Sequence, residues 1–372
     1  MKSTVPFIDL KLQHQSVASE IRRAMDGIFA SQRFVMGPRG DALEKNIAKR
    51  LKSRHGIGLA SGTDALYLAL LAMGVGPGDE VLTTPFTFFA TASSIARTGA
   101  RPVFADIHPR TFNLDPELAA AKITPKTRVI LPVHLFGLPC DMDPILSLAK
   151  RHGFFVLEDV AQALGAEYKG KPAGSMGQAA ALSFYPTKNL GGAGDGGMAV
   201  TSSDKFAERI RRLRDHGQVK KYVHAEIGIN SRLDEIQATV VGIKLKRLDS
   251  WNRARRRHAA DYDKAFEGLP LDTPLVPKGY THIYHLYSVL TERRDELAAH
   301  LGRSGIGAGV YYPLPLHLQP CFKSLGYRAG DFPIAENISK KILSLPMYAE
   351  LTSGQKERTI VSVRRFFERQ RK

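Results

Sequence analysis

The sequence is poor in cysteine and in long apolar runs. Its two cysteines, Cys140 and Cys321, do not lie in a Cys-x-x-Cys pair, which disfavours a disulfide framework, a zinc ribbon and an iron–sulfur cluster. No apolar run approaches the ~20 residues that a membrane helix needs. Residues 1–6 lack the apolar stretch of a signal peptide. We therefore expect a cytoplasmic protein that does not contact a membrane.

Motifs of several enzyme classes are also missing. The chain has no Gly-x-Ser-x-Gly and its 12 histidines include no His-Glu-x-x-His, so we expect neither a serine hydrolase nor a bound metal. Residues 192–197 formally match Gly-x-Gly-x-x-Gly, but a dinucleotide fingerprint opens a helix. Here the run leads into the strand-like residues 198–201. We interpret the glycine-dense run 191–197 as a flexible loop.

The charge is strongly positive. The chain has 372 residues, 43% of them hydrophobic, and a net charge of +17. Much of this charge falls in residues 209–214 and 253–258, which we interpret as solvated faces of amphipathic helices. Two other uses of the charge stay open, attraction of a phosphorylated substrate and DNA binding by a regulator. A regulator needs a helix-turn-helix or an arginine-rich arm, and neither is clear, so we expect no nucleic-acid partner.

Helical patterns alternate with short β-rich segments between residues 40 and 220. The expected helices are 41–52, 63–73, 88–97 and 145–151, and the expected strands are 80–83, 102–105, 129–134, 154–157, 179–184 and 198–201. Alternation at this spacing predicts an α/β fold with a mostly parallel, doubly wound sheet. We assign residues 1–35 to an N-terminal arm with one helix at 16–29, and residues 36–245 to a large domain.

The pattern changes after Asn230. Residues 233–266 carry an apolar stripe that predicts one long helix bridging a large and a small domain. The remainder predicts strands at 285–290 and 309–312 and helices at 295–303, 334–343 and 355–369. Residues 246–372 are therefore expected to form a helical extension and a smaller α+β domain.

Lys188 is the residue that points most clearly to chemistry. It follows the short apolar stretch 179–184 and precedes the glycine-dense run. Such an amine can form a Schiff base with an aldehyde cofactor. Upstream, Asp159 places a carboxylate after the apolar run 154–157. A lysine for the aldehyde and an acid for the ring nitrogen are the pair that pyridoxal 5′-phosphate (PLP) needs; an ordinary exposed lysine is the alternative.

Other segments fit the same cofactor. Residues 61–66 place small side chains at the start of an apolar helix, where free N–H groups and the helix dipole favour a phosphate. Ordinary capping explains that pattern equally well. Phe88 is the candidate for stacking on the ring, although core packing suits at least two of the three neighbouring phenylalanines. Gln162 could reach the cofactor hydroxyl, and Ser183 could reach the phosphate.

At these residues the chain resembles the nucleotide-sugar aminotransferases of the DegT–StrS group, within the fold-type I PLP enzymes. The resemblance covers nearly the whole chain. The matching segments are 7–10, 37–38, 61–66, 158–159, 183–190, 230–238 and 315–320. It implies an aminotransferase that uses PLP, with pyridoxamine 5′-phosphate (PMP) as the intermediate form of the cofactor.

The resemblance also implies a role for each cofactor residue. Lys188 would hold the aldehyde, Asp159 the ring nitrogen and Gln162 the ring hydroxyl. Those expected at the phosphate are Gly62, Thr63 and Ser183, with Phe88 on the ring face. Asn230 would reach the phosphate of the neighbouring subunit, which implies a homodimer with shared active sites.

Substrate contacts are implied at four positions. Tyr185 and His317 fall where members of the group meet the sugar nucleotide. Many members carry a histidine where this chain has Tyr311, a difference that affects the sugar contacts and leaves the cofactor chemistry intact. The segment around Lys221 (residues 220–224) resembles members that act at C-3 of the sugar more than those that act at C-4.

The implied reaction has two halves. L-Glutamate gives up its amino group and leaves as 2-oxoglutarate, and a keto sugar linked to UDP or dTDP then accepts that group, for amino-sugar biosynthesis. A UDP-linked 2-acetamido sugar is the first expectation. A keto-cyclitol, a C-4 keto sugar and PLP binding without turnover stay as alternatives. Lys188 must be neutral when it takes a proton, so its surroundings should favour loss of its charge.

Overall fold

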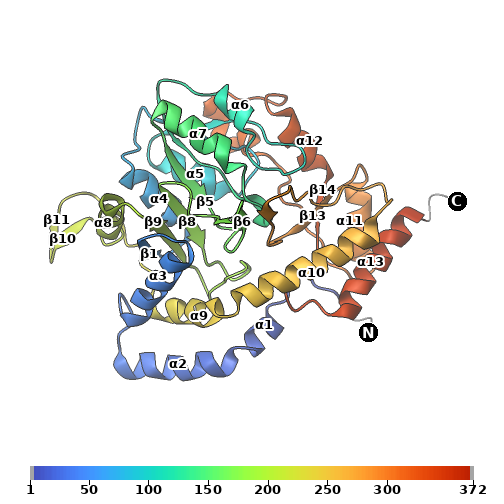
Figure 1. The fold of residues 1–372 in the computed structure, drawn as a ribbon, viewed down its shortest axis with the longest axis horizontal. Helices are drawn as coiled ribbons and strands as arrows, with labels where there is room; N and C mark the ends of the chain where they lie inside the picture. The colour runs from blue at the N-terminus through green and yellow to red at the C-terminus, as the bar shows by residue number, and fades with distance from the viewer. Residues whose placement is uncertain (1–3, 369–372) are drawn as a thin grey trace.

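A seven-stranded sheet forms the centre of the protein, whose computed structural model describes residues 4–368 (Figure 1). In spatial order the strands are β1 (His55–Leu59), β9 (Gly197–Thr201), β8 (Ala179–Ser183), β5 (Phe155–Asp159), β4 (Thr127–Ile130), β2 (Glu80–Thr83) and β3 (Arg101–Phe104). All neighbouring pairs from β8 to β3 are parallel, whereas β9 is antiparallel to both of its neighbours. The prediction of a mostly parallel sheet is confirmed.

Helices cover both faces of this sheet. Because side chains alternate along a strand, Ala181 belongs to one core and Leu182 to the other. The first core lies under α4 (Gly62–Ala72), α5 (Phe89–Arg97) and α8 (Asp204–Leu213). The opposite face is covered by α3 (Pro38–Arg50), α6 (Pro116–Ala120), α7 (Met142–His152) and α9 (Glu235–Leu245). The sheet is therefore doubly wound, as predicted.

The C-terminal region has a core of its own. Helix α10 (Leu248–Phe266) runs away from the sheet toward α11 (Arg294–Arg303) and α13 (Ser353–Glu368), as Figure 1 shows. Beside them, β13 (Tyr287–Leu290) pairs antiparallel with β14 (Ile342–Leu345), and α12 (Pro333–Lys341) precedes β14. The rings of Tyr262, Phe266 and Tyr287 pack together in this core. A smaller α+β unit is thus present, and we keep its boundary after residue 245 as a proposal.

The predicted long helix 233–266 is wrong, because the structure has two helices there. Helix α9 ends at Leu245 and α10 begins at Leu248. The two helices serve different cores: Val241 packs under the sheet, whereas Tyr262 packs in the C-terminal core. One continuous apolar stripe could not satisfy both surfaces, so the chain turns between them.

The predicted strand 309–312 is also wrong. Only Gly309 makes a bridge, to Ser344, and the residues that follow leave the sheet. Tyr311 stacks on Phe7 with ring centroids 5.7 Å apart, and the Tyr312 hydroxyl accepts a hydrogen bond from Gln162. These side-chain contacts replace the alternation that a strand would require. The neighbouring strand β13 forms, but it begins at Tyr287 and not at residue 285.

Two arginines that the charge pattern placed on solvated helix faces are buried. Arg214 donates to Glu44 Oε1 at 2.6 Å and to the carbonyl oxygen of Gly58 at 2.9 Å. Arg255 donates from one guanidinium nitrogen to the main-chain oxygens of residues 284, 285 and 347. Their neighbours Arg211 and Arg257 are exposed, as expected. The charge pattern along the sequence therefore predicted the helices, but it did not show that Arg214 and Arg255 are buried.

Several short elements had no clear sequence signal. The arm contains α1 (Lys11–Gln15) before α2 (Ala18–Ser31), and the latter packs along α9. A three-stranded sheet is formed by β6 (Glu167–Tyr168), β7 (Lys171–Pro172) and β12 (Tyr280–Thr281). Among residues 4–368, no helix has both the length and the apolar character needed to cross a membrane.

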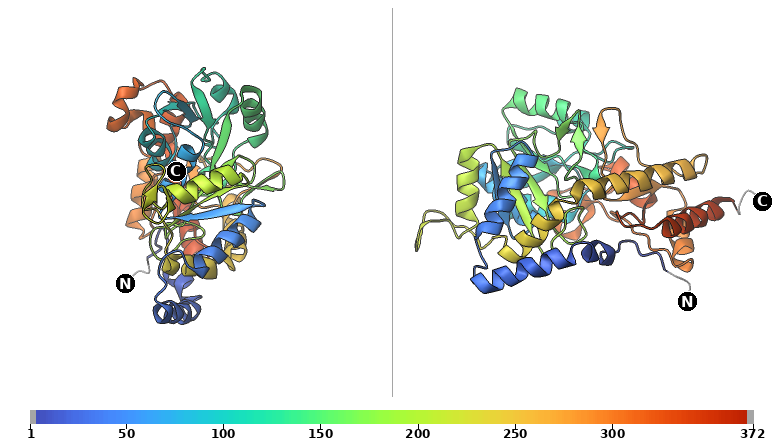
Figure 2. Two further views of the ribbon diagram at one scale, coloured as in Figure 1. Left: turned by 90° about the vertical axis from the view of Figure 1, so that its left-hand side faces the viewer. Right: turned by 60° about the horizontal axis from the view of Figure 1, so that its bottom comes forward.

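A hairpin projects beyond α8 at one edge of the molecule (Figures 1 and 2). Its strands are β10 (Gln218–Lys220) and β11 (Val223–His224), which are antiparallel. Tyr222 stands at the turn and 81% of it is exposed, while Ile227 just beyond the hairpin is 97% exposed. Large apolar side chains so open to solvent suggest a surface that another molecule covers.

Candidate active site

Lys188 lies on the loop that follows β8. Its main-chain N–H donates to the carbonyl oxygen of Tyr185 at 2.8 Å, which closes a tight turn. The residue is half-buried. Burial lowers the pKa of the Lys188 amine from 10.5 to about 8, and the charge of Asp159 opposes that shift. The amine can therefore lose its proton near physiological pH, as the proposed chemistry requires.

Asp159 ends β5, the strand beside β8. Because the two strands are parallel neighbours, their carboxyl ends bring the acid and the Lys188 loop to one edge of the sheet. Asp159 is buried and accepts hydrogen bonds from the Thr91 hydroxyl at 3.0 Å and from the N–H of Ala161 at 3.1 Å. Burial raises the pKa of Asp159, while these two bonds and the Lys188 charge lower it. A protonated ring nitrogen placed here would favour the ionised carboxylate.

The N-terminus of α4 and the end of β8 form a close cradle. Ser61 caps the helix by accepting the N–H of Asp64 at 3.1 Å. A Cβ on Gly62 would lie 2.7 Å from Cβ of Ser183, and one on Gly197 would lie 2.3 Å from the carbonyl group of Ser61. Only glycine lets these segments approach so closely. The first-turn N–H groups of a helix have no partner within the helix, so Gly62, Thr63 and Ser183 fit a phosphate.

Gln162 is held by two hydrogen bonds. Its Oε1 accepts the N–H of Phe136 at 2.9 Å, and its Nε2 donates to the Tyr312 hydroxyl at 3.0 Å. The Tyr312 ring lies 6.4 Å from that of Phe88, which is 56% exposed. Tyr312 thus contacts both Gln162, predicted to bind the cofactor hydroxyl, and Phe88, predicted to stack on the cofactor ring. Sequence reasoning missed Tyr312 and Thr91, although each adjoins a motif that it had singled out.

Two of the residues predicted to contact the sugar lie near each other. Tyr185 is exposed three residues before Lys188. Burial raises the pKa of Tyr311, and the nearby Tyr185 hydroxyl adds to that shift. Their role at the sugar stays a prediction.

The other three residues predicted to contact the substrate have different surroundings. His317 is buried with Nε2 3.0 Å from Glu336 Oε1 and its ring against Phe332, so it faces α12. Lys221 sits in the projecting hairpin, with its Nζ 5.3 Å from the centre of the Tyr222 ring. Asn230 is exposed. The hydrogen bond and ring contacts described for His317 and Lys221 do not involve Lys188, and the roles of all three residues stay predictions.

In the glycine-dense run, residues 191–196 form a loop and Gly197 begins β9, and hydrogen bonds restrain this loop more than expected. The carbonyl of Gly191 accepts from Lys244 Nζ at 2.9 Å, and the N–H of Ala193 donates to Gln237 Oε1 at 2.8 Å. A Cβ on Gly191 would lie 2.3 Å from the carbonyl oxygen of Pro186. These glycines serve close packing against the lysine loop, and hydrogen bonds from α9 fix the run in place.

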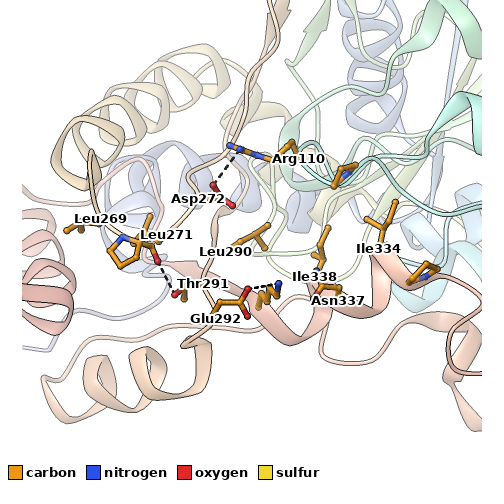
Figure 3. A pocket seen from close by; sticks show the side chains of 14 residues that line it. Arg110, Leu269, Leu271, Asp272, Leu290, Thr291, Glu292, Ile334, Asn337 and Ile338 are labelled. Carbon is orange, nitrogen blue, oxygen red and sulfur yellow. Dashed lines mark hydrogen bonds and ion pairs between the residues drawn. The ribbon is translucent and has the colours of Figure 1, made fainter. Parts of the chain in front are cut away.

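A cavity of about 600 Å³ opens elsewhere, between α12 and the end of β13 (Figure 3). Leu290, Ile334 and Ile338 form part of its apolar lining. Charged residues at the cavity pair with one another, Arg110 with Asp272 at 3.5 Å and Lys341 with Glu292 at 2.6 Å. No predicted site residue lines this cavity.

The doubly wound sheet, with a partly buried lysine beside a buried acid and a glycine-lined helix N-terminus, fits a PLP-dependent enzyme of fold type I. Comparison with known proteins makes this specific. The profile of the DegT/DnrJ/EryC1/StrS aminotransferase family matches residues 15–364. The chain belongs to this family, so the predicted sugar-nucleotide transaminase class and PLP as its cofactor are confirmed.

Curated relatives match over almost their entire lengths. A pleiotropic regulatory protein of Geobacillus stearothermophilus is 50% identical over 98% of this chain and 98% of its own. A dTDP-3-amino-3,4,6-trideoxy-α-D-glucose transaminase of Streptomyces venezuelae is 44% identical over 98% and 97%. A UDP-N-acetyl-3-dehydro-α-D-glucosamine 3-aminotransferase of Acidithiobacillus ferrooxidans is 42% identical over 98% of each chain.

Solved structures share the fold. The crystal structure of DesV from S. venezuelae, in complex with a ketimine intermediate, gives a TM-score of 0.96 at 44% identity, covering 98% of this chain and 99% of that one. NtdA from Bacillus subtilis, with bound cofactor PMP, gives 0.91 at 30% identity, covering 98% and 86%. The predicted fold class is confirmed at this level.

Proposed function

We propose that the protein transfers the amino group of L-glutamate to C-3 of a keto sugar linked to UDP or dTDP. The observation that carries the proposal is the approach of Lys188 and Asp159 at the carboxyl edge of the sheet, beside the N-terminus of α4. The sugar substrate is inferred from relatives. The roles of Lys188 in proton transfer and of Asp159 in holding a charged ring nitrogen are inferred from this chain's own residues.

The side chains divide the work by position. When bound, PLP supplies an electron sink that eases removal of a proton from the carbon bearing the amino group. Lys188 Nζ would hold the cofactor aldehyde until the amine of the donor takes its place, and the freed Lys188 amine would then move this proton, a role typically worth ~10²–10⁴-fold. Asp159 keeps the ring nitrogen charged, and its hydrogen bond from Thr91 holds the carboxylate in place. Gly62, Thr63 and Ser183 bind the phosphate, while Phe88 covers the ring.

The choice of C-3 rests on relatives and on the hairpin. Two of the relatives named above carry names of transaminases that act at C-3, one on a dTDP sugar and one on a UDP sugar. The hairpin contains residues 220–224, the segment that resembles members acting at C-3. Its Lys221 is also a cation suited to the diphosphate of a sugar nucleotide. A UDP-linked 2-acetamido sugar is our first choice of acceptor, and a cytoplasmic location stays a prediction.

The working unit is proposed to be a homodimer with shared active sites. Asn230 is exposed, whereas the next residue, Ser231, is buried and donates to Asp64 Oδ2 at 2.8 Å. The chain is thus anchored beside α4 while Asn230 stays free to face a second subunit. The exposed side chains Tyr222 and Ile227 would be covered by the same contact.

A panel of acceptors tests the substrate. The PMP form is incubated with UDP- and dTDP-linked 3-keto and 4-keto sugars and with a keto-cyclitol, and the aminated products are identified by mass spectrometry. We expect a product from a 3-keto sugar nucleotide. Amination of the 4-keto sugar alone would overturn the choice of carbon. Amination of the cyclitol, with no thermal protection by UDP or dTDP, would overturn the sugar-nucleotide assignment.

Subunit complementation tests the shared site. We expect the Lys188→Ala and Asn230→Ala variants each to be weak alone, and subunits of the two variants are then refolded together. If Asn230 serves the partner's site, a mixed dimer contains one site with both residues intact, and activity returns to roughly a quarter of wild type. A mixture no more active than its parts would overturn the shared-site proposal.

A further inference from the structure

The residue after Lys188 is locked by its side chain. Asn189 is buried, and its Nδ2 donates to Asn252 Oδ1 at 2.8 Å and to the carbonyl oxygen of Ile283 at 3.3 Å. Its Oδ1 lies 3.1 Å from Nδ1 of His285. Because Asn189 and Lys188 share a peptide bond, fixing this amide fixes the backbone from which the lysine side chain departs.

The direction of each hydrogen bond follows from chemistry. A main-chain carbonyl only accepts, so the contact with Ile283 fixes which end of the Asn189 amide carries hydrogen. The amide oxygen then faces His285, whose Nδ1 must donate. Burial lowers the pKa of His285 well below 6.5, and the charges of Lys188 and Arg255 lower it further. His285 is therefore a neutral donor that adds no positive charge beside the lysine.

The same network reaches the loop that carries the acid. Asn252, on α10, donates from Nδ2 to the carbonyl oxygen of Leu164 at 3.2 Å. Leu164 follows Gln162 by two residues, in the loop that comes directly after Asp159 at the end of β5. Gly165 has φ +98°, and a Cβ there would lie 2.6 Å from Asn252 Nδ2, so the loop packs directly on this amide. One chain of hydrogen bonds thus joins the lysine loop, α10 and the acid loop.

We propose that Asn189, Asn252 and His285 are positioning residues for the Lys188 amine. They hold the lysine loop at a fixed distance from the Asp159 loop and keep the amine in the partly buried place where it loses its proton readily. This inference rests on the role of Lys188 given under the proposed function. It adds three residues that touch neither cofactor nor substrate and act through the lysine.

The test compares His285→Leu with His285→Asn. Asparagine places an N–H close to the former Nδ1 and can still donate to Asn189, whereas leucine cannot. In the cofactor-free protein, the Lys188 amine is acetylated over a pH series and the labelled peptide is quantified. We expect a wild-type midpoint near pH 8. Leucine should raise it by about one unit, because a loosened loop lets water reach the amine, and asparagine should restore most of the wild-type value.

Turnover provides a second readout. Loss of positioning should lower kcat by ~10–100-fold in His285→Leu, with KM for glutamate changed less than about threefold. Asn252→Ala removes both the acceptor for Asn189 Nδ2 and the donor to Leu164, but it leaves the contacts of Asn189 with Ile283 and His285. It should therefore shift the midpoint and kcat in the same direction by less. It also serves if His285→Leu does not fold.

The control is His258→Leu, which removes a partly buried histidine outside this network, whose Nε2 lies 3.2 Å from the main-chain oxygen of Ala349. It should lower Tm and leave the Lys188 midpoint at its wild-type value. Equal midpoints in His285→Leu, Asn252→Ala and wild type would overturn the positioning role. If borohydride fails to attach PLP to Lys188 of the wild-type protein, the proposed function fails instead, so the two failures are distinguishable.

Discussion

The Lys188 site and the cavity of Figure 3 differ in how they treat charge. At the cavity, Arg110 and Asp272 are about half exposed and satisfy each other, and water screens their pairing. At the site, Asp159 is 5% exposed and sits near a lysine whose pKa burial has lowered to about 8. By its volume the cavity would be the candidate active site. A buried acid near a partly buried lysine with a lowered pKa is the stronger indication of catalysis, and it is found at the Lys188 site.

Removing the lysine should have the largest effect. Lys188→Ala is expected to lower transamination by at least ~10³-fold, because it removes the amine proposed to hold the aldehyde and move the proton. Borohydride should then attach no PLP to the chain. The matched control is Lys169→Ala, which removes an exposed lysine paired with Asp143, and it should leave both readouts unchanged. Normal turnover in Lys188→Ala would remove the basis of the proposed mechanism.

Neutralising the acid should have the next largest effect. Asp159→Asn keeps the shape of the side chain but loses the charge that faces the ring nitrogen, so kcat should fall by ~10²–10³-fold. Since the Asp159 charge raises the pKa of Lys188, the variant should also move the acetylation midpoint of the lysine below 8. Asp143→Asn is the control at an exposed ion pair. A midpoint that rises would contradict the assigned direction.

Cofactor chemistry was more predictable from sequence than the scaffold that fixes it. Lys188, Asp159 and the segment 61–66 each belong to a short, recognisable sequence motif. The order of the strands then brings the three motifs to one edge of the sheet. The network of Asn189, Asn252 and His285 joins residues up to 96 positions apart. Common residue types at such separations leave no local pattern. The inward turn of Arg255 escaped for the same reason, because its partners are main-chain carbonyls in distant segments.

The pH response of the lysine should be moderate and one-directional. Acetylation of Lys188 in the cofactor-free protein should rise about tenfold per pH unit below 8 and then level off, because only the neutral amine reacts. The folded pKa lies below the ordinary value, so the unfolded chain binds more protons between pH 8 and 10.5. The free energy of unfolding should therefore rise with pH across that window, because burial of the charged Lys188 amine destabilises the fold below pH 8 and this penalty is lost as the amine is deprotonated. A midpoint near 10.5 would show a solvated amine.

Filling the cradle should have a smaller effect. Gly62→Ala places a Cβ 2.7 Å from Cβ of Ser183, so α4 must move away or strain its first turn. We expect a loss of ~1–3 kcal/mol in the free energy of unfolding and weaker binding of PLP, measured by thermal unfolding and by titration of the cofactor. Gly76→Ala is the control, because a Cβ there meets nothing within 4 Å. Equal PLP affinity in both variants would argue against a phosphate at this helix end.

Breaking the cavity's ion pair should have the smallest effect. Arg110 and Asp272 lie 3.5 Å apart with side chains 45% and 55% exposed, and such pairs typically contribute ~0–1 kcal/mol. Arg110→Ala should therefore shift Tm only slightly and leave kcat and KM unchanged, since the cavity shares no lining residue with the Lys188 site. High salt should remove the remaining difference from wild type, because exposed charges are screened. A loss of turnover in Arg110→Ala would mean that the two regions are coupled, and that burial of charge alone does not separate the reacting site from its surroundings.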